Sequence, residues 1–317
     1  MLRIGITMGD PSGVGPEIIL KALNSFSGKA KFRIVGDAWV LAKIGKLAQG
    51  QYPNTDFYDL ANVKRRSFKF GKPSLDNARC SVEYLDFALG LLKNGQLDCL
   101  VTAPVSKEWI NSCGIKWRGH TEYIAEKFQC KDFAMMLLNG KMKFILATRH
   151  IPLASVSKAL NAGMLFKLVS HAVISLKTLF GINRPRLVIC ALNPHASDNG
   201  VIGSEENNII KPAVMKLKRK FRHNCIDLLP ADIAIYKHYR GYYDCAIALY
   251  HDQSLIALKL TDDFNSGVNL TLGLGFVRTS PLHGTAFDIA GTNRASHLSF
   301  LEAINTAIRC TINLKKS

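Results

Sequence analysis

The first 26 residues, MLRIGITMGDPSGVGPEIILKALNSF, contain a complete strand–turn–helix unit. Residues 2–8 form a short apolar run that predicts a buried strand, and a glycine-rich turn follows it. Residues 16–26 have the apolar spacing of a helix, and Pro16 suits a first helical position because that residue needs no N–H donor there. The chain therefore opens with a β-strand that leads directly into an α-helix.

The same alternation continues along the chain and predicts an α/β protein. Strands separated by helices favour largely parallel sheets with helices on both faces. The length of 317 residues suits two lobes, and a weak boundary lies near residue 130. We expect a first lobe of residues 1–130 plus 290–317 and a second lobe of residues 131–289. The predicted strands are 31–35, 97–101, 144–147, 187–192, 225–229 and 245–250, and the further helices are 82–92, 163–180 and 205–221.

Composition indicates an ordinary globular protein, with 48% hydrophobic and 21% charged residues. The longest apolar runs are far shorter than the roughly 20 residues that span a bilayer. The N-terminus reaches its turn before a signal-peptide core could form. The eight cysteines are scattered without a C-x-x-C pair, which favours free thiols in a reducing compartment. We expect a cytoplasmic protein with no membrane partner.

A formal net charge of +17 raises the question of an anionic partner. Basic clusters occur at 64–66, 216–222 and 315–316. The middle cluster follows Glu205-Glu206, an order typical of a solvated helix that is acidic at its start and basic at its end. Net charge reports non-specific attraction, and no nucleic-acid-binding signature accompanies it. We expect no nucleic-acid partner, and a basic nucleic-acid-binding module is kept only as a remote alternative.

Three histidines follow predicted strands, where ligands of parallel sheets bind. They are His150, His195 and His251. Neutral imidazoles suit zinc or another first-row divalent ion, and three ligands leave a coordination position for substrate. A single histidine after a strand is more often structural, and gaps of 45 and 56 residues do not prove that the three converge.

A second group of residues suits an anion. His120 and Thr121 open a predicted helix at 123–128, where Thr121 is an acceptable N-cap and backbone N–H groups welcome negative charge. Simple helix capping explains the same residues. Lys259, Asn269 and Arg278 could complete a phosphate or carboxylate site. Taken alone, each of these three is more often a surface residue.

Seven blocks of sequence, in order along almost the whole chain, carry a resemblance to a known family. The blocks are ITMGDPSGVGPE (6–17), VTAPVSK (101–107), GHTEY (119–123), RHIPL (149–153), LNPHA (192–196), YHDQ (250–253) and GVNLTLGLGFVRTSPLHGTAFDIAG (267–291). Together they resemble the 4-hydroxythreonine-4-phosphate dehydrogenase family of vitamin B6 biosynthesis. Chance does not readily produce seven ordered blocks.

The last block is also similar to the nicotinamide-cofactor loop of isopropylmalate and isocitrate dehydrogenases. The resemblance implies their fold, with two α/β/α lobes around a cleft, which binds NAD without a Rossmann glycine fingerprint. Two departures, Leu282 in place of an acidic residue and Gly275 in place of a proline, bear on cofactor affinity. The implied cofactor-binding residues are His283, Gly284, Thr285 and Ala286.

The resemblance also assigns the remaining site residues and the assembly. It implies one divalent metal per site (zinc, magnesium or cobalt) and a homodimer with active sites at the subunit interface. The second lobe would carry the metal histidines and the dimer interface. The implied metal ligands are His150, His195 and His251, and the implied substrate-binding residues are His120, Thr121, Lys259, Asn269 and Arg278.

The implied reaction is oxidation of 4-phosphohydroxy-L-threonine by NAD or NADP. The β-keto acid product would lose carbon dioxide to give 3-amino-2-oxopropyl phosphate, a step of pyridoxal 5'-phosphate biosynthesis. Asp232 and Asp252 are candidates for the general acid–base, and orienting the histidines is the other role open to Asp252. Threonate or erythronate 4-phosphate are alternative substrates. A phosphate acyltransferase of the same fold would require neither metal nor nicotinamide.

Overall fold

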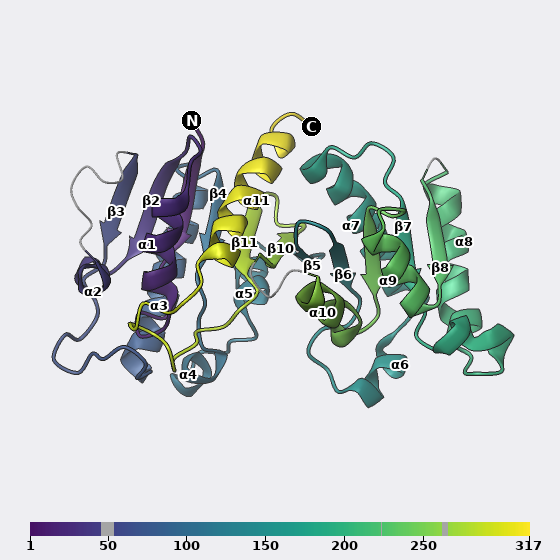
Figure 1. The fold of residues 1–317 in the computed structure, drawn as a ribbon, viewed down its shortest axis with the longest axis horizontal. Coiled ribbons are helices and arrows are strands. Elements are labelled where there is room, and N and C mark those ends of the chain that lie inside the picture. The colour runs from purple at the N-terminus through teal and green to yellow at the C-terminus, as the bar shows by residue number, and fades with distance from the viewer. Residues whose placement is uncertain (46–53, 223, 262–265) are drawn as a thin grey trace. The chain divides into compact units, whose positions relative to one another are not determined.

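The computed structural model describes residues 1–45, 54–222, 224–261 and 266–317. Its contacts divide the chain into two compact units, and each is an α/β unit as predicted (Figure 1). Unit 1 comprises Met1–Lys131 and Asn265–Ile312, and unit 2 comprises Asp132–Phe264 and Asn313–Ser317.

The described strands of unit 1 form a mostly parallel sheet in the order β3-β2-β1-β4-β11-β10. β11 runs parallel to β4, and β10 alone is antiparallel, as the hairpin partner of β11. Helix α3 packs against β1, β2 and β4, and Figure 1 shows α1 and α11 in front of the strands. The strands are β1 (Arg3–Thr7), β2 (Lys31–Gly36), β3 (Thr55–Asp59), β4 (Cys99–Thr102), β10 (Val268–Leu272) and β11 (Val277–Pro281), and the helices are α1 (Gly15–Ser25), α2 (Ala38–Ile44), α3 (Leu75–Lys93), α4 (Lys107–Ser112), α5 (His120–Lys127) and α11 (Leu298–Leu314).

The described strands of unit 2 lie in the order β5-β6-β9-β7-β8. Its strands are parallel except for the β5–β6 hairpin. The strands are β5 (Ala134–Leu138), β6 (Lys143–Leu146), β7 (Leu187–Cys190), β8 (Ile226–Leu229) and β9 (Cys245–Ala248), and the helices are η1 (Leu153–Ser155), α6 (Val156–Ala159), α7 (Ala162–Phe180), η2 (Pro194–Gly200), η3 (Glu206–Ile210), α8 (Lys211–Lys220), α9 (Ala231–Tyr239) and α10 (His251–Leu260).

Burial explains the sequence patterns of unit 2. Every residue of β7 and of β9 is buried, as expected for parallel strands covered on both faces. Helix α7 begins where the Asn161 side chain accepts a hydrogen bond from the Met164 N–H, and it ends at Gly181, whose φ is 70°. By length and composition α7 could cross a membrane, but half of its most apolar stretch is buried inside the protein. It is a core helix of this unit.

The division into units differs from the expected one at the C-terminal side. The first boundary falls after Lys131, next to the expected residue 130. Residues 266–289 were expected in the second lobe, but they belong to unit 1 because β11 pairs with β4 and β10 pairs with β11. The pairing of β10 and β11 with strands of unit 1 places these residues there. The order of strands along the sequence does not show which strands pair. All eight cysteines are free, as expected.

Candidate active site

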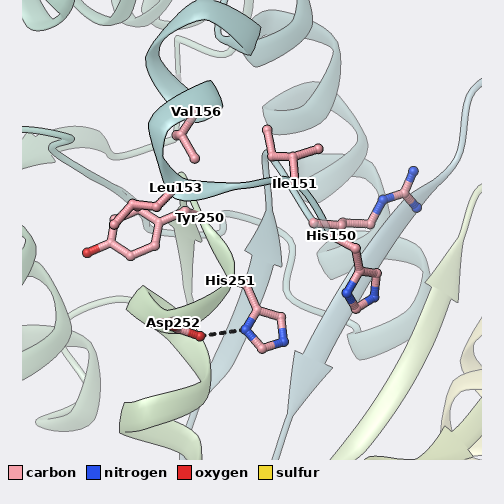
Figure 2. A pocket seen from close by; sticks show the side chains of 8 residues that line it. His150, Ile151, Leu153, Val156, Tyr250, His251 and Asp252 are labelled. Atoms are coloured by element: carbon pink, nitrogen blue, oxygen red, sulfur yellow. Dashed lines mark hydrogen bonds and ion pairs between the residues drawn. The ribbon is translucent and has the colours of Figure 1, made fainter.

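A pocket of about 260 Å³ in unit 2 contains two of the three predicted metal histidines (Figure 2). The ring centroids of His150 and His251 lie 5.7 Å apart, with the ring planes at 47°. His150 follows β6 and His251 follows β9, and these strands are parallel neighbours. Their carboxyl ends therefore lie at one edge of the sheet, which brings the two imidazoles together. Tyr250, Leu153 and Val156 line the same pocket.

Asp252 holds the ring of His251 in place. Its Oδ1 lies 2.6 Å from Nδ1 of His251, as Figure 2 shows. A carboxylate on one ring nitrogen fixes the orientation of a metal-binding histidine and presents the other nitrogen. The donor set of two imidazoles suits a first-row divalent ion. The geometry of Asp252 matches the orienting role, one of the two roles considered for it.

His195 lies outside this pocket. It is exposed in η2, after β7, where the five residues from His195 to Asn199 all have left-handed backbone angles. Among the residues that the structure describes, no three His, Cys, Asp or Glu side chains are close enough to hold a metal ion. One chain therefore groups two of the three histidines and leaves the third apart.

Glu205 and Glu206 are not the solvated start of a helix, contrary to expectation. Glu206 is fully buried and accepts hydrogen bonds from the backbone N–H groups of Leu192 and Asn193. Hydrogen bonds from Ser157 and Asn193 lower the pKa of Glu205 to about 2. The pattern of charges could not show these contacts because the partners lie 12 to 48 residues earlier in the chain.

Unit 1 contains a buried cationic cluster around Arg278 of β11. The Arg278 side chain is 1% exposed, and burial lowers its pKa to about 9. Its guanidinium donates hydrogen bonds to the hydroxyls of Thr102 and Thr271, while its buried Nε has no hydrogen-bond partner. Within the described part of the chain, no carboxylate forms an ion pair with it. A desolvated guanidinium with an unused N–H is suited to an anion.

Three other predicted substrate-binding residues share this cluster. The Thr121 hydroxyl lies 3.3 Å from the Thr271 hydroxyl, and His120 is the first residue of α5. Burial, with the positive charges of Arg278 and Lys107, lowers the pKa of His120 well below 6.5, so its ring is neutral. Asn269 lies two residues before Thr271, on the same face of β10, and its Oδ1 is buried without a hydrogen-bond partner.

Two further predicted residues of unit 2 lie outside the histidine pocket. Lys259 is exposed in the last turn of α10, roughly 12 Å along the helix from His251 at the rise of an α-helix. Asp232 is exposed in the first turn of α9. Neither lines the histidine pocket of unit 2. Conversely, sequence reasoning assigned no role to Thr102 and Thr271, which hold the guanidinium. The feature that could have identified them is their position on β4 and β10, the two strands that flank β11 and its Arg278.

The predicted cofactor loop, His283 to Ala286, packs against the glycine-rich turn after β1. The Val14 N–H donates to the carbonyl of Thr285 over 3.0 Å, and a Cβ on Gly13 would lie 3.0 Å from the same oxygen. Gly13 thus permits a close approach of two backbones. Burial lowers the pKa of His283, whose Nε2 has no hydrogen-bond partner. Gly284 is exposed, and Ala286 has a left-handed φ of 41°.

Known proteins are similar to this chain over nearly its whole length. The family model "Pyridoxal phosphate biosynthetic protein PdxA" matches residues 17–307. The 4-hydroxythreonine-4-phosphate dehydrogenase of Sulfurihydrogenibium sp. (strain YO3AOP1) is 40% identical over 97% of this chain and 98% of that protein. The crystal structure of the enzyme of that name from Klebsiella pneumoniae has a TM-score of 0.86 at 32% identity, covering 98% of this chain and 100% of its own. The one from Burkholderia phymatum has a TM-score of 0.80 at 33% identity, covering 98% of each chain.

Fold, clusters and relatives together define an oxidoreductase built from two α/β units. The chain belongs to the family of the pyridoxal phosphate biosynthetic protein PdxA. The resemblance found in its seven sequence blocks is confirmed.

Proposed function

We propose that this protein is an NAD(P)- and divalent-metal-dependent 4-hydroxythreonine-4-phosphate dehydrogenase. The observation that carries the proposal is the His150–His251 pocket, with one ring held by Asp252, in a chain of this family. The carbinol carbon of 4-phosphohydroxy-L-threonine gives a hydride to the nicotinamide, and its hydroxyl gives up a proton. The carboxylate then leaves as carbon dioxide, and a proton takes its place on the carbon that bears the amine. The product is 3-amino-2-oxopropyl phosphate.

His150 and His251 would hold the metal, together with His195. A bound zinc, magnesium or cobalt ion supplies a Lewis acid that acidifies the substrate hydroxyl and polarises the carbonyl formed from it. Asp252 occupies Nδ1 of His251, which leaves Nε2 as the ring nitrogen that would bind a metal ion. Asp252 and Asp232 remain the candidates for the proton-transferring group.

A homodimer would complete the site. One chain groups only His150 and His251, so a second copy of the chain supplies the third histidine in this proposal. Exposed apolar side chains in the same unit support an interface, with Leu153 69%, Ile256 61% and Leu260 80% exposed. A two-fold dimer then carries two identical shared sites.

The cluster around Arg278 would bind the negative groups of the substrate. A phosphate or carboxylate would accept a hydrogen bond from the unused N–H of the guanidinium. Its negative charge would also compensate the buried positive charge of Arg278. Thr121, Asn269 and neutral His120 surround it with donors and acceptors, and Lys259 would add a further positive charge. This arrangement suits a doubly anionic, phosphorylated acid.

The loop from His283 to Ala286 would bind NAD or NADP, and the protein would act in the cytoplasm without a nucleic-acid or membrane partner. The cofactor accepts the hydride, while the protein contributes position and electrostatics. The loop is held by Val14 on the turn after β1, which fixes its backbone in advance.

The test is nicotinamide reduction by the purified protein with each of three substrates. These are 4-phosphohydroxy-L-threonine, threonate 4-phosphate and erythronate 4-phosphate, each with NAD and with NADP. We expect the highest kcat/KM with the first substrate, loss of activity after chelation, and recovery on adding zinc, cobalt or magnesium. A higher kcat/KM for either of the other phosphates would assign the protein to that substrate. Absence of nicotinamide reduction with all three would contradict the proposal.

A further inference from the structure

Adjacent carboxylates, Glu205 and Glu206, connect the segments that bear His150 and His195. Glu206 is fully buried at the start of η3. Its Oε1 accepts the backbone N–H groups of Leu192 and Asn193, each over 2.8 Å, and its Oε2 accepts the Asn193 side-chain amide over 2.8 Å. Glu206 thereby fixes the chain between the end of β7 and the turn that presents His195.

Glu205 extends this connection to the other histidine segment. Its Oε2 accepts the same Asn193 amide over 2.9 Å, and its Oε1 accepts the Ser157 hydroxyl over 2.6 Å. Ser157 belongs to α6, directly after Val156 of the histidine pocket and seven residues after His150. One side chain therefore contacts both segments.

The turn that bears His195 needs such support. Five consecutive residues without glycine, from His195 to Asn199, have φ between 43° and 62°. The left-handed region costs L-residues about 1–2 kcal/mol each, and such a conformation persists only where the surroundings determine it. The carbonyl of Asn199 accepts the side-chain amide of Asn207, so the residues at 205–207 hold the turn at both ends.

The buried carboxylate of Glu206 is surrounded by neutral N–H donors. Glu206 forms no ion pair with any cation in the described part of the chain, so its burial is balanced by neutral N–H donors alone. Acceptor-only oxygens are what three converging N–H donors demand. All three donors to Glu206 belong to Leu192 and Asn193, directly before the turn that bears His195.

We propose that Glu205 and Glu206 are positioning residues of the metal sites: they fix the turn whose His195 each chain would present to its partner, and they anchor that turn on α6, next to the His150 pocket of the same chain. This inference rests on the proposed role of the histidines as metal ligands. It predicts that metal affinity falls when the carboxylates are changed, although neither one is itself a ligand.

The first test is calorimetric titration of the metal-free protein with zinc. Glu205→Gln replaces a carboxylate oxygen by an NH₂ group, which cannot accept the hydrogen bond of Ser157 or Asn193. Because this loosens the His195 turn, the zinc Kd should rise about tenfold or more. Glu205→Asp keeps the charge but withdraws the oxygens by one methylene, and it should raise the Kd less. The control is Glu302→Gln in α11, a partly exposed carboxylate beside Arg309, which should leave the Kd unchanged.

Ser157→Ala tests the link between the two segments. It removes the hydroxyl that contacts Glu205, and its effect on zinc affinity should not add to that of Glu205→Gln, because both changes break the same contact. Full additivity would overturn the coupling. Glu206→Gln should weaken zinc binding most. If Glu206→Gln does not fold, the zinc Kd values of Glu205→Gln and Ser157→Ala test the inference, because those two residues are only partly buried.

Failure of this inference is distinguishable from failure of the proposed function. If the wild type binds zinc, His150→Ala loses it and Glu205→Gln retains it within twofold, the inference is overturned while the metal site stands. If the wild type binds no zinc, the metal proposal fails. The imidazole NMR signals of His150 and His195 then test whether Glu205 positions the two histidines. Glu205→Gln should shift both signals and Glu302→Gln neither, whereas signals unchanged in both variants would overturn the inference.

Discussion

The two units present their candidate residues in opposite ways. In unit 1, Arg278 is 1% exposed on a central strand, and threonines of the neighbouring strands hold its guanidinium. In unit 2, the side chains of His251 and Asp252 are 38% and 70% exposed at the start of a helix. A buried cluster is preorganised by the sheet itself, whereas an exposed pair depends on something else to complete it. In our proposal the anion site is therefore complete within one chain, and the histidine site is completed by a second chain.

The largest effect is expected from the histidine pair. His150→Ala or His251→Ala should abolish nicotinamide reduction, because the loss of one ligand destroys the geometry of a three-ligand metal site. The thermal unfolding midpoint should change little, since the pocket is open to solvent. His171→Ala in α7, outside both clusters, is the matched control. Near-normal turnover of a metal-free His251→Ala protein would contradict the metal role.

Arg278 tests the buried side of the comparison. Arg278→Met should cost on the order of 2–5 kcal/mol in transition-state binding, measured as kcat/KM, because it removes a desolvated charge that holds the substrate. Its stability in urea should not fall, since an apolar side chain of similar volume avoids the cost of burying a cation. Unchanged kinetics would show that the cluster is structural.

Buried His238 in unit 2 predicts the pH dependence of folding. Its Nε2 accepts the Lys143 N–H and its Nδ1 donates to the Tyr243 carbonyl, and burial lowers its pKa from 6.5 to about 4. Between those values the unfolded chain binds a proton that the native protein does not. The contribution of neutral His238 to the free energy of unfolding is therefore fully present above pH 6.5. As the pH falls from 6.5 to about 4, the free energy of unfolding decreases by about 3 kcal/mol.

Urea unfolding at a series of pH values measures this loss. His238→Gln should be less stable at pH 7 and should show a flatter pH profile. An equally steep profile in that variant would assign the acid sensitivity to other groups.

Mixing two inactive variants sharpens the claim that the histidine site is shared. His195→Ala and His251→Ala, exchanged as subunits, should regain about a quarter of wild-type activity, since about half of the dimers are mixed and one of their two sites is intact. The control mixture, His150→Ala with His251→Ala, should stay inactive because those two residues line one pocket of one chain. No recovery in either mixture, with exchange confirmed by mass, would place all three ligands in one chain.

The sequence predicted those features that local patterns encode. The predicted strand at 2–8 is β1, and the predicted helix at 163–180 is α7. The rule that ligands bind at strand ends pointed to His150 and His251, whose rings are neighbours in the structure. The rule did not extend to His195, because the residues after β7 turn left-handed and no spacing of residue types announces this.

Long-range pairing accounts for the other differences. Burial of Glu206 depends on backbone groups 13 and 14 residues earlier, and the threonines around Arg278 depend on the order of strands in the sheet. Neither leaves a periodic signal in the sequence. The roles of Lys259 and Asp232, like those of the other candidate site residues, stay predictions.

The position of β11 beside β4 has a consequence for how the chain is made on the ribosome. β4 ends at Thr102, but its neighbour on one side, Val277–Pro281, is synthesised after the whole of residues 132–264. During that interval the apolar edge of β4 lacks its native neighbour, and exposed edges invite pairing with other nascent chains. Translation that stops near residue 264 should therefore yield aggregates, although every residue of unit 2 up to that point has already been made.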